Sequence, residues 1–191
     1  MPVVAELERV LVDRAGSPEK PFLAAIEGRC GSGKSTLAAY LAARRGWSVI
    51  HADDFFLRPS QRTPERYAEP GGNLDRERFL EEVLVPLRSG RPVRYRPFDC
   101  RSMRLREAVS VTPTPVVLIE GSYSCHPLFR DFYDLRVFLT VDPETQAARI
   151  LRRNGAEKAV LFASRWIPME ERYFQAFSVR ERCDYVLDMS D

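Results

Sequence analysis

The sequence has little of several features that mark common protein classes. It contains two His and four Cys residues with no C-x-x-C pair, so a zinc site is not expected and the thiols are typical of reduced cysteines. No apolar run approaches the roughly 20 residues that a membrane-spanning helix requires. The first 16 residues include three acidic side chains, which is unlike a secretory signal peptide. We therefore expect a cytoplasmic protein without a membrane partner.

The chain also lacks an excess of one charge. Its 29 Lys and Arg residues face 27 Asp and Glu residues, which gives a net charge of +2. Proteins that bind nucleic acid usually show a strong basic excess, so no nucleic-acid partner is expected. The only lysines are Lys20, Lys34 and Lys158. We attribute this preference for Arg mainly to genome composition, although Arg also suits phosphate recognition. The sequence leaves the oligomeric state open, a homo-oligomer included.

Helical and extended patterns alternate along the chain from residue 22 to the end. Apolar spacing and capping residues predict helices at 3–14, 35–45, 75–87, 143–153 and 163–178. Compact apolar runs predict strands at 22–27, 47–51, 115–120, 135–141 and 185–187. The Pro- and Gly-rich segment 57–73 is expected to be a loop, and 93–98 is a candidate to pair with 107–111 as a hairpin.

This alternation predicts an α/β fold, with a parallel sheet of about five strands and helices on both faces. The 191 residues fit a single domain, with a core over 22–188 and an N-terminal helix within 1–16. Ligands of such sheets bind beyond the carboxyl ends of the strands. The chemistry is therefore expected at 28–36, 52–56 and 120–123, each of which follows a predicted strand.

The segment 28–35, with the sequence GRCGSGKS, fits the phosphate-binding pattern G-x-x-x-x-G-K-[ST] at every fixed position. Its glycines let backbone N–H groups converge on phosphate oxygens, and the helix that follows adds the positive end of its dipole. Lys34 is expected to reach the β- and γ-phosphates of ATP, and Ser35 to ligate Mg²⁺. The predicted ATP-binding residues are Gly28, Arg29, Cys30, Gly31, Ser32, Gly33, Lys34, Ser35 and Thr36. We interpret Cys30 as a small loop residue and not a nucleophile, in a loop that could lower its thiol pKa.

Other motifs narrow the class of phosphate-binding protein. No Asn-Lys-x-Asp motif for guanine recognition is present, which argues against a GTPase switch. The strand that ends at Glu120 continues as Glu-Gly, without the Asp-Glu pair of ring ATPases, and the chain is too short for their second domain. These observations favour a kinase that acts on a small molecule.

A series of further segments follows the phosphate-binding loop in a fixed order. They are 51–56 (HADDFF), 73–79 (NLDRERF), 90–93 (GRPV), 97–99 (PFD), 119–121 (IEG), 142–145 (DPET), 149–153 (RILRR), 166–173 (WIPMEERY) and 183–186 (CDYV). In this order the sequence resembles the uridine/cytidine kinases over about residues 22–188, within the superfamily that also holds phosphoribulokinase and bacterial pantothenate kinase. The resemblance implies a P-loop kinase fold with a small hairpin and lid insertion, ATP and Mg²⁺ as cofactors, and phosphorylation of the 5′-hydroxyl of uridine or cytidine.

The resemblance assigns roles to several acidic residues. Asp53 is implied to be the base that accepts the hydroxyl proton, with Asp54 as the neighbouring alternative; both could instead cap the loop. Glu120 ends the most buried strand, where a Mg²⁺ contact or a structural hydrogen bond would offset the cost of burying its carboxyl. The predicted metal ligands are Ser35, Asp53 and Glu120. Asp75 resembles the residue that holds the ribose hydroxyls, but it also suits the N-cap of its helix.

The basic residues of the predicted lid helix lie at a helical spacing. Arg149 and Arg153 are four residues apart and therefore share one face, from which they are expected to neutralise charge during phosphoryl transfer. A solvated helix face is the alternative. Arg152 lies off that face and is expected on the surface. The predicted catalytic set is thus Asp53, Lys34, Arg149 and Arg153.

The resemblance weakens in the segment expected to hold the acceptor. Phe98 replaces a Tyr of the family and can still stack, but residues 100–104 contain no His. Arg101 or Arg104 would suit a negatively charged or differently shaped acceptor. The lid also departs from the family pattern at 154–155, where this chain has Asn-Gly. The predicted substrate-binding residues are Asp53, Asp75, Phe98 and Arg104. The alternatives to a nucleoside kinase are a kinase of another metabolite, of the pantothenate or sugar type, and a nucleotide-binding regulatory module.

Overall fold

The computed structural model describes residues 2–190, so Met1 and Asp191, the ends of the predicted ranges, lie outside the described residues. A central sheet of five parallel strands has the order β2–β7–β1–β8–β9. These strands are β1 (Phe22–Gly28), β2 (Ser48–His51), β7 (Val116–Glu120), β8 (Leu135–Thr140) and β9 (Tyr185–Asp188). The predicted parallel sheet and its five strands are confirmed, and every boundary lies within one residue of its prediction.

The two central strands are apolar at nearly every position because both faces of the sheet are covered. In β1, Leu23 and Ala25 point into one core cluster, while Ala24 and Ile26 point into the other. The residues of β7 alternate in the same way, and all five of them are buried. A continuous apolar run therefore satisfies two separate cores.

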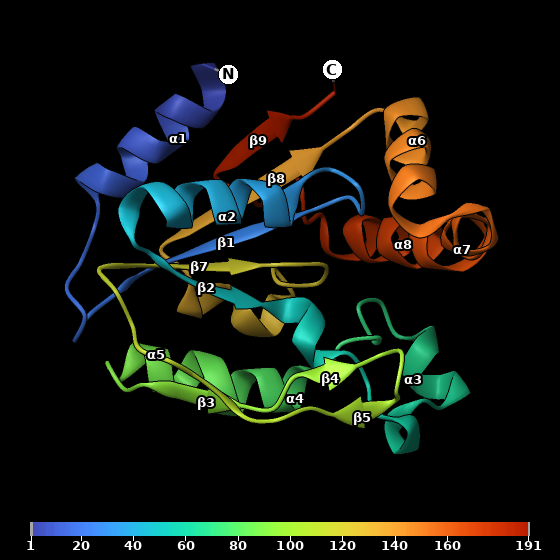
Figure 1. Cartoon of the computed structure of the whole chain (residues 1–191), viewed down its shortest axis with the longest axis horizontal. Helices are drawn as coiled ribbons and strands as arrows, with labels where there is room; N and C mark the ends of the chain where they lie inside the picture. Colours follow the sequence, from blue (N-terminus) through green and yellow to red (C-terminus); the bar gives the residue numbers. More distant parts are fainter. Residues whose placement is uncertain (1, 191) are drawn as a thin grey trace.

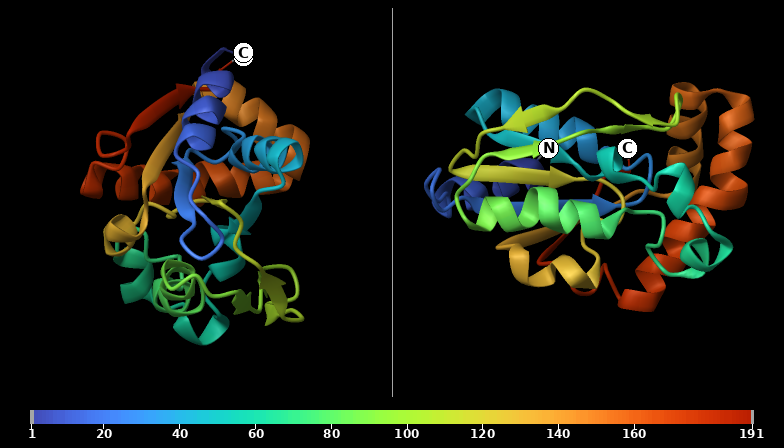
Figure 2. Two further views of the ribbon diagram at one scale, coloured as in Figure 1. Left: turned by 90° about the vertical axis from the view of Figure 1, so that its left-hand side faces the viewer. Right: turned by 90° about the horizontal axis from the view of Figure 1, so that it is seen from below.

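Helices cover both faces, as predicted (Figure 1). On one face, α1 (Pro2–Asp13) and α2 (Lys34–Arg45) bury Leu7, Leu11, Leu37 and Leu41 against the sheet. The other face is covered by a continuous helical segment made of α4 (Arg76–Phe79), the π turn Leu80–Leu84 and α5 (Val85–Arg88). The 3₁₀ segment Pro127–Phe132 and α8 (Ile167–Phe177) complete that layer. Figure 1 and the left view of Figure 2 place the α4–α5 segment on the opposite side of the sheet from α1 and α2.

A small antiparallel insertion follows α5. Strand β3 (Val93–Tyr95) pairs with β6 (Val109–Val111), which confirms the predicted hairpin. The long connection contains a second ladder, β4 (Phe98–Asp99) with β5 (Arg104–Leu105). This inner ladder brings the turn at residues 100–103 toward the carboxyl end of the sheet.

Two sequence predictions were wrong in part. The expected loop 57–73 contains a 3₁₀ turn at Pro59–Gln61 and the helix α3 (Pro64–Ala68). Thr63 caps α3 by accepting a hydrogen bond from the Arg66 N–H, and Pro64 occupies the first position of the helix. The Thr-Pro pair is typical of a helix N-terminus, so the sequence contained a signal for α3.

The helix expected at 163–178 begins earlier. It starts with α7 (Ala156–Leu161) and continues through a π turn at Phe162–Trp166 into α8. Gly155 separates α7 from α6 (Pro143–Asn154), and both helices lie beyond the carboxyl ends of the strands (Figure 1). No helix within residues 2–190 is long and apolar enough to cross a membrane.

Candidate functional site

A pocket of about 520 Å³ lies at the carboxyl ends of β1, β2 and β7. All three segments in which the sequence predicted chemistry contribute to its wall. The predicted site residues in its lining are Cys30, Gly31, Gly33, Lys34, Ser35, Thr36, Asp53, Glu120 and Arg153. The parallel topology explains this convergence, because neighbouring parallel strands end at the same edge of the sheet.

The phosphate-binding loop has the backbone that an anion site requires. Gly33 is the N-cap of α2 with a φ of 93°, a left-handed conformation that favours glycine. Because it has no side chain to cap the helix, the first-turn N–H groups of α2 stay available to phosphate oxygens. Gly28 is required for a different reason, since a Cβ there would overlap the backbone of Leu139 in β8. The loop thus fits a polyphosphate.

The side chain of Lys34 points back into the phosphate-binding loop. Its ammonium donates to the carbonyl oxygens of Gly28 at 2.6 Å and Arg29 at 3.0 Å, and its side chain is largely buried. Two carbonyl acceptors hold the ammonium at the floor of the pocket and leave its third N–H group for a ligand. This position suits the predicted contact with phosphate oxygens.

Ser35 and Glu120 join the loop to the end of β7. The Ser35 hydroxyl donates to Oε2 of Glu120 at 3.0 Å, while Oε1 of Glu120 lies 2.5 Å from Nδ1 of His51. The hydrogen bond to Glu120 raises the pKa of His51, which favours an imidazolium donor. The buried Glu120 carboxyl therefore has protein partners on both oxygens, as the structural interpretation of this residue predicted.

The hydroxyl and carboxylate oxygens of this pair are the ligand type that Mg²⁺ prefers. Within residues 2–190, no group of three or more His, Cys, Asp or Glu side chains could hold a metal ion by itself. Mg²⁺ at a nucleotide site usually binds one or two protein ligands together with substrate phosphates and water. The Ser35–Glu120 pair fits an ion that is shared with a nucleotide.

The neighbouring residues Asp53 and Asp54 have different surroundings. Asp53 lines the pocket and faces solvent there, whereas Oδ2 of Asp54 accepts a hydrogen bond from the Tyr95 hydroxyl at 2.9 Å. The pKa of Asp53 is raised to about 6, first because the surrounding protein displaces water from its carboxylate and then because of the charge of Glu120, while Lys34 opposes the shift. Of the two aspartates, only Asp53 is placed to meet a substrate in this pocket.

Glu170 of α8 is a site residue that the sequence did not reveal. Its Oε2 accepts a hydrogen bond from the backbone N–H of Cys30 at 3.0 Å, and its Oε1 accepts one from the Ser122 hydroxyl at 2.6 Å. Burial, followed by the charge of Glu170, raises the pKa of the Cys30 thiol. The prediction that the loop could lower this pKa was therefore wrong. The local sequence around Glu170 does not predict its contact with Cys30, which lies 140 residues earlier in the chain.

Glu27 lies at the carboxyl end of β1, next to Gly28 of the phosphate-binding loop. Its carboxyl accepts hydrogen bonds from the N–H groups of Gly28, Tyr123 and Cys125 and from the Tyr173 hydroxyl, at 3.0–3.2 Å. It is fully buried. Glu27 therefore fixes β1, the segment after β7 and α8 relative to one another, immediately behind the phosphate-binding loop.

A second, more open pocket of about 880 Å³ lies between the loop, α2 and α6, the helix predicted to form the lid. Arg149 donates to the carbonyl oxygens of Gly31 at 3.4 Å and Met189 at 2.9 Å. Arg149 and Arg153 share this pocket, as their spacing predicted, and Arg153 also lines the first pocket. Arg152, predicted on the surface, is exposed but lines the second pocket as well.

The predicted substrate residues other than Asp53 lie outside the first pocket. Asp75 is buried, and its Oδ1 accepts a hydrogen bond from the Arg78 N–H at 3.4 Å, as the capping interpretation predicted. Phe98 is buried beneath the guanidinium of Arg62, and Arg104 lies on the exposed strand β5. The acceptor contacts of these three residues stay predictions. The pocket is lined instead by Arg62, Asn73 and Arg101.

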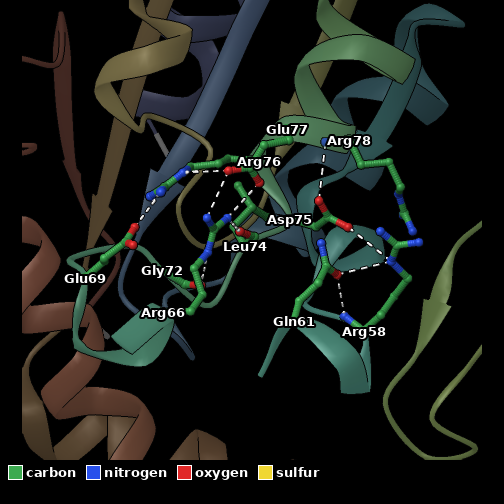
Figure 3. A network of polar contacts seen from close by, with 10 residues as sticks. All are labelled: Arg58, Gln61, Arg66, Glu69, Gly72, Leu74, Asp75, Arg76, Glu77 and Arg78. Atoms are coloured by element: carbon green, nitrogen blue, oxygen red, sulfur yellow. Dashed lines mark hydrogen bonds and ion pairs between the residues drawn. The ribbon is translucent and has the colours of Figure 1, made fainter. Parts of the chain in front are cut away.

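Asp75 belongs to a polar network that fixes residues 58–78 (Figure 3). Its Oδ2 lies 3.5 Å from Nε of Arg58. Arg66 donates to the carbonyl oxygens of Gly72 and Leu74 and forms a two-pronged ion pair with Glu77. The network holds the segment that carries Arg62 and Asn73 to the pocket.

No protein-family model matches the chain. Among curated proteins, it is 25% identical over 150 residues to uridine kinase-like protein 5 of Arabidopsis thaliana, a match over 73% of this chain and 32% of the relative. It is 26% identical over 149 residues to the uridine kinase of Alkaliphilus metalliredigens, over 73% of this chain and 71% of the relative. The chain spans about a third of the length of the first curated relatives that it matches.

Two solved structures share the fold over nearly the whole chain. The "possible uridine kinase" from Bacillus stearothermophilus has a TM-score of 0.70 at 21% identity, and the match covers 97% of each chain. The "putative fructose transport system kinase" from Silicibacter sp. TM1040 has a TM-score of 0.75 at 27% identity, over 96% of this chain and 98% of the other. By sequence this chain is similar to the uridine kinases, and its fold is that of the P-loop kinases.

Proposed function

We propose that this protein transfers the γ-phosphoryl group of ATP to a hydroxyl group of a small molecule. One observation carries the proposal: Lys34 of the phosphate-binding loop, the Ser35–Glu120 pair and the Asp53 carboxyl meet in one pocket. Phosphoryl transfer depends mainly on positioning and electrostatic stabilisation, and these groups supply both.

Asp53 is the proposed base. Its carboxylate would accept the proton of the acceptor hydroxyl, and its raised pKa of about 6 makes it a stronger base that is still mostly ionised at neutral pH. Lys34 and Arg153, together with the free N–H groups of α2, would stabilise the charge of the transferring group. Ser35 and Glu120, with Asp53, would hold the Mg²⁺ that neutralises the phosphates when ATP binds.

A nucleoside is the first candidate acceptor. The support for it is the ordered resemblance to uridine/cytidine kinases and the similarity to relatives named uridine kinase. A second candidate is another metabolite, of the sugar or pantothenate type, because Asp75 and Phe98 do not line the pocket and Arg62 and Arg101 do. A nucleotide-binding regulatory module, with no acceptor chemistry, is the remaining alternative.

The test is a measurement of ADP release by the purified protein with ATP and Mg²⁺. Nucleosides, pantothenate, sugars and sugar phosphates would each be added separately, and the release without any acceptor is the baseline. A kinase is expected to release ADP faster with its acceptor, in step with the appearance of phosphorylated product. If no nucleoside stimulates release, the nucleoside acceptor is wrong. If no acceptor of any class does so, the regulatory alternative gains support.

A further inference from the structure

Two guanidinium groups lie on the side of the first pocket that surrounds Asp53. Arg62 comes from the turn before α3, and Arg101 comes from the tip of the β4–β5 ladder. Strand β4 packs against the Ala52–Phe55 turn that carries Asp53. Arg101 follows β4 closely in the chain, and Arg62 lies over the ring of Phe98 in β4, so both arginines lie near the turn that carries the proposed base. Neither belongs to the phosphate-binding loop or the lid.

The position of Arg62 is fixed by its surroundings. Its Nε donates to the carbonyl oxygen of Leu57 at 2.8 Å, and its guanidinium lies 5.4 Å from the centre of the Phe98 ring. The same guanidinium contacts the thiol of Cys100, the residue next to Arg101. The carbonyl and the ring hold the guanidinium in one orientation at the pocket wall, which lowers the entropy that it would lose on binding a ligand.

Neither arginine has an acidic partner within residues 2–190. No carboxylate in that part of the chain lies within ion-pair distance of Arg62 or Arg101, whereas Arg58, Arg66 and Arg76 of the neighbouring network all pair with acidic residues. Two acidic residues of the pocket already have hydrogen-bond partners within the protein. Glu120 bonds to Ser35 and His51, and Glu170 bonds to Cys30 and Ser122. Asp53 is needed as the base.

We propose that the acceptor is an alcohol that also carries an anionic group, a carboxylate or a phosphate, and that Arg62 and Arg101 bind this group. The inference rests on the proposed kinase function. A guanidinium presents a planar fork of N–H donors that matches both carboxylate and phosphate oxygens. In the reaction, the acceptor oxygen forms a bond to the γ-phosphorus, the bond from that phosphorus to the β–γ bridging oxygen breaks to release ADP, and the hydroxyl proton passes to Asp53.

The test compares acceptors in matched pairs that differ only or mainly in charge. Suitable pairs are uridine with uridine 3′-monophosphate, fructose with fructose 6-phosphate, glycerol with glycerate, and pantothenol with pantothenate. The first two pairs add a phosphate and the last two a carboxylate, so the pairs also separate the two sources of charge. In at least one pair, the anionic member is expected to have a kcat/KM at least tenfold above that of the neutral member.

Variants of the two arginines test the contact itself. Arg62→Gln and Arg101→Gln are each expected to raise KM for the anionic acceptor at least tenfold with little change in kcat, and to leave KM for a neutral acceptor unchanged. Arg62→Lys keeps the charge but loses the fork, so its effect is expected to be smaller. Arg94→Gln is the matched control, because Arg94 is exposed on β3 and lies outside the pocket.

Fluorescence of Trp166, which lines the pocket, gives acceptor binding without turnover in a Trp47→Phe background. The anionic acceptor is expected to change this signal, with a Kd that rises at least tenfold in Arg101→Gln. Because the Arg101 side chain is exposed, its replacement is expected to leave the fold intact, and a thermal melt checks this. If neutral members bind and react as well as anionic ones, and the Gln variants behave like Arg94→Gln, the inference is wrong while the kinase stands. If no acceptor stimulates ADP release, the proposed function fails and the inference with it.

Discussion

The carboxylate of Glu170 in α8 accepts a hydrogen bond from the backbone N–H of Cys30, with 3.0 Å between Oε2 and the nitrogen. Its other oxygen accepts the Ser122 hydroxyl, so one buried side chain joins the phosphate-binding loop to the segment after β7. The loop that would bind ATP is thus held by a helix 140 residues away in the sequence. These two hydrogen bonds restrain the conformation of a glycine-rich loop.

Glu170→Ala is expected to raise KM for ATP about tenfold or more, because the loss of two hydrogen bonds to a buried carboxylate costs roughly 1.5–3 kcal/mol each and loosens the loop. Glu170→Gln is the control, since its amide can still accept the Cys30 N–H and donate to Ser122. Steady-state kinetics against ATP, with thermal melts to check folding, would measure both variants. Equal KM values for Ala and wild type would show that the loop does not depend on Glu170.

Asp53→Asn is expected to reduce kcat by about 10²-fold or more while the Kd for ATP stays near the wild-type value, because removal of a general base typically costs 10²–10⁴-fold. Asp54→Asn is the matched control: its amide oxygen can still accept the Tyr95 hydroxyl, so its effect is expected to be small. Turnover and ATP titrations on both variants would give the answer. A regulatory module would keep its ATP binding and partner-dependent behaviour in both.

Arg153→Ala is expected to lower kcat by about 10²-fold, since Arg153 lines both pockets and would meet the transferring phosphoryl group. Arg152→Ala tests the neighbouring cation, which lines only the more open pocket, and should mainly raise KM for ATP by a few-fold. Single-turnover measurements separate the two effects. Similar losses of kcat in both variants would argue against a special role for Arg153.

The sequence was sufficient for the frame of the site because that frame depends on local patterns. The loop at 28–35 lies between an apolar strand and a helix, and strand ends at 51 and 120 bring Asp53 and Glu120 to the same edge of the sheet. The parallel sheet, the hairpin and the caps at Asp75 and Asp142 follow from the same short-range rules.

The remaining residues of the site are set by tertiary packing. Glu170 bonds to residues 140 and 48 positions away, and Glu27 bonds to Tyr123 and Cys125, more than 90 positions away, so their spacing carries no signal. Arg62 lies in a segment that composition marked only as a loop, and it reaches the pocket because the network around Arg66 and Asp75 folds that segment back (Figure 3). Asp75 matched a family motif, yet in this structure its carboxyl lies near Arg58 and does not line the first pocket.

Gly72→Ala is expected to destabilise the protein more than Gly46→Ala. A Cβ at Gly72 would overlap the backbone carbonyl of Arg66, which cannot move without breaking the bonds of Arg66 to Leu74 and Glu77. Overpacking of this kind costs roughly 1–3 kcal/mol or more. Gly46 has a φ of 69° and open space, so alanine adds only about 1–2 kcal/mol of backbone strain. At about 2–4 °C per kcal/mol for a chain of this size, thermal melts should resolve the difference. Equal Tm losses would show that the segment yields easily.

Glu27 gives the folding stability a pH dependence. Burial raises its pKa to about 7, although Lys34 and the hydrogen bonds from Cys125 and Gly28 oppose the shift. The folded protein therefore holds this proton more tightly than the unfolded chain, whose carboxyl titrates near 4.5. The contribution to stability is fully present below pH 4.5 and is lost as the pH rises through 7.

Glu27→Gln cannot titrate, so the difference in the free energy of unfolding between wild type and this variant isolates the effect. From pH 5 to pH 8 we expect wild type to lose on the order of 2–3 kcal/mol relative to Glu27→Gln in urea unfolding. The subtraction matters because buried His126, with a pKa lowered to about 4, contributes the opposite trend in both proteins. A constant difference across this range would mean that the four donors around Glu27 keep its carboxylate ionised in the folded state. The hydrogen-bond cluster around Glu27, behind the phosphate-binding loop, would then contain a carboxylate and not a protonated carboxyl.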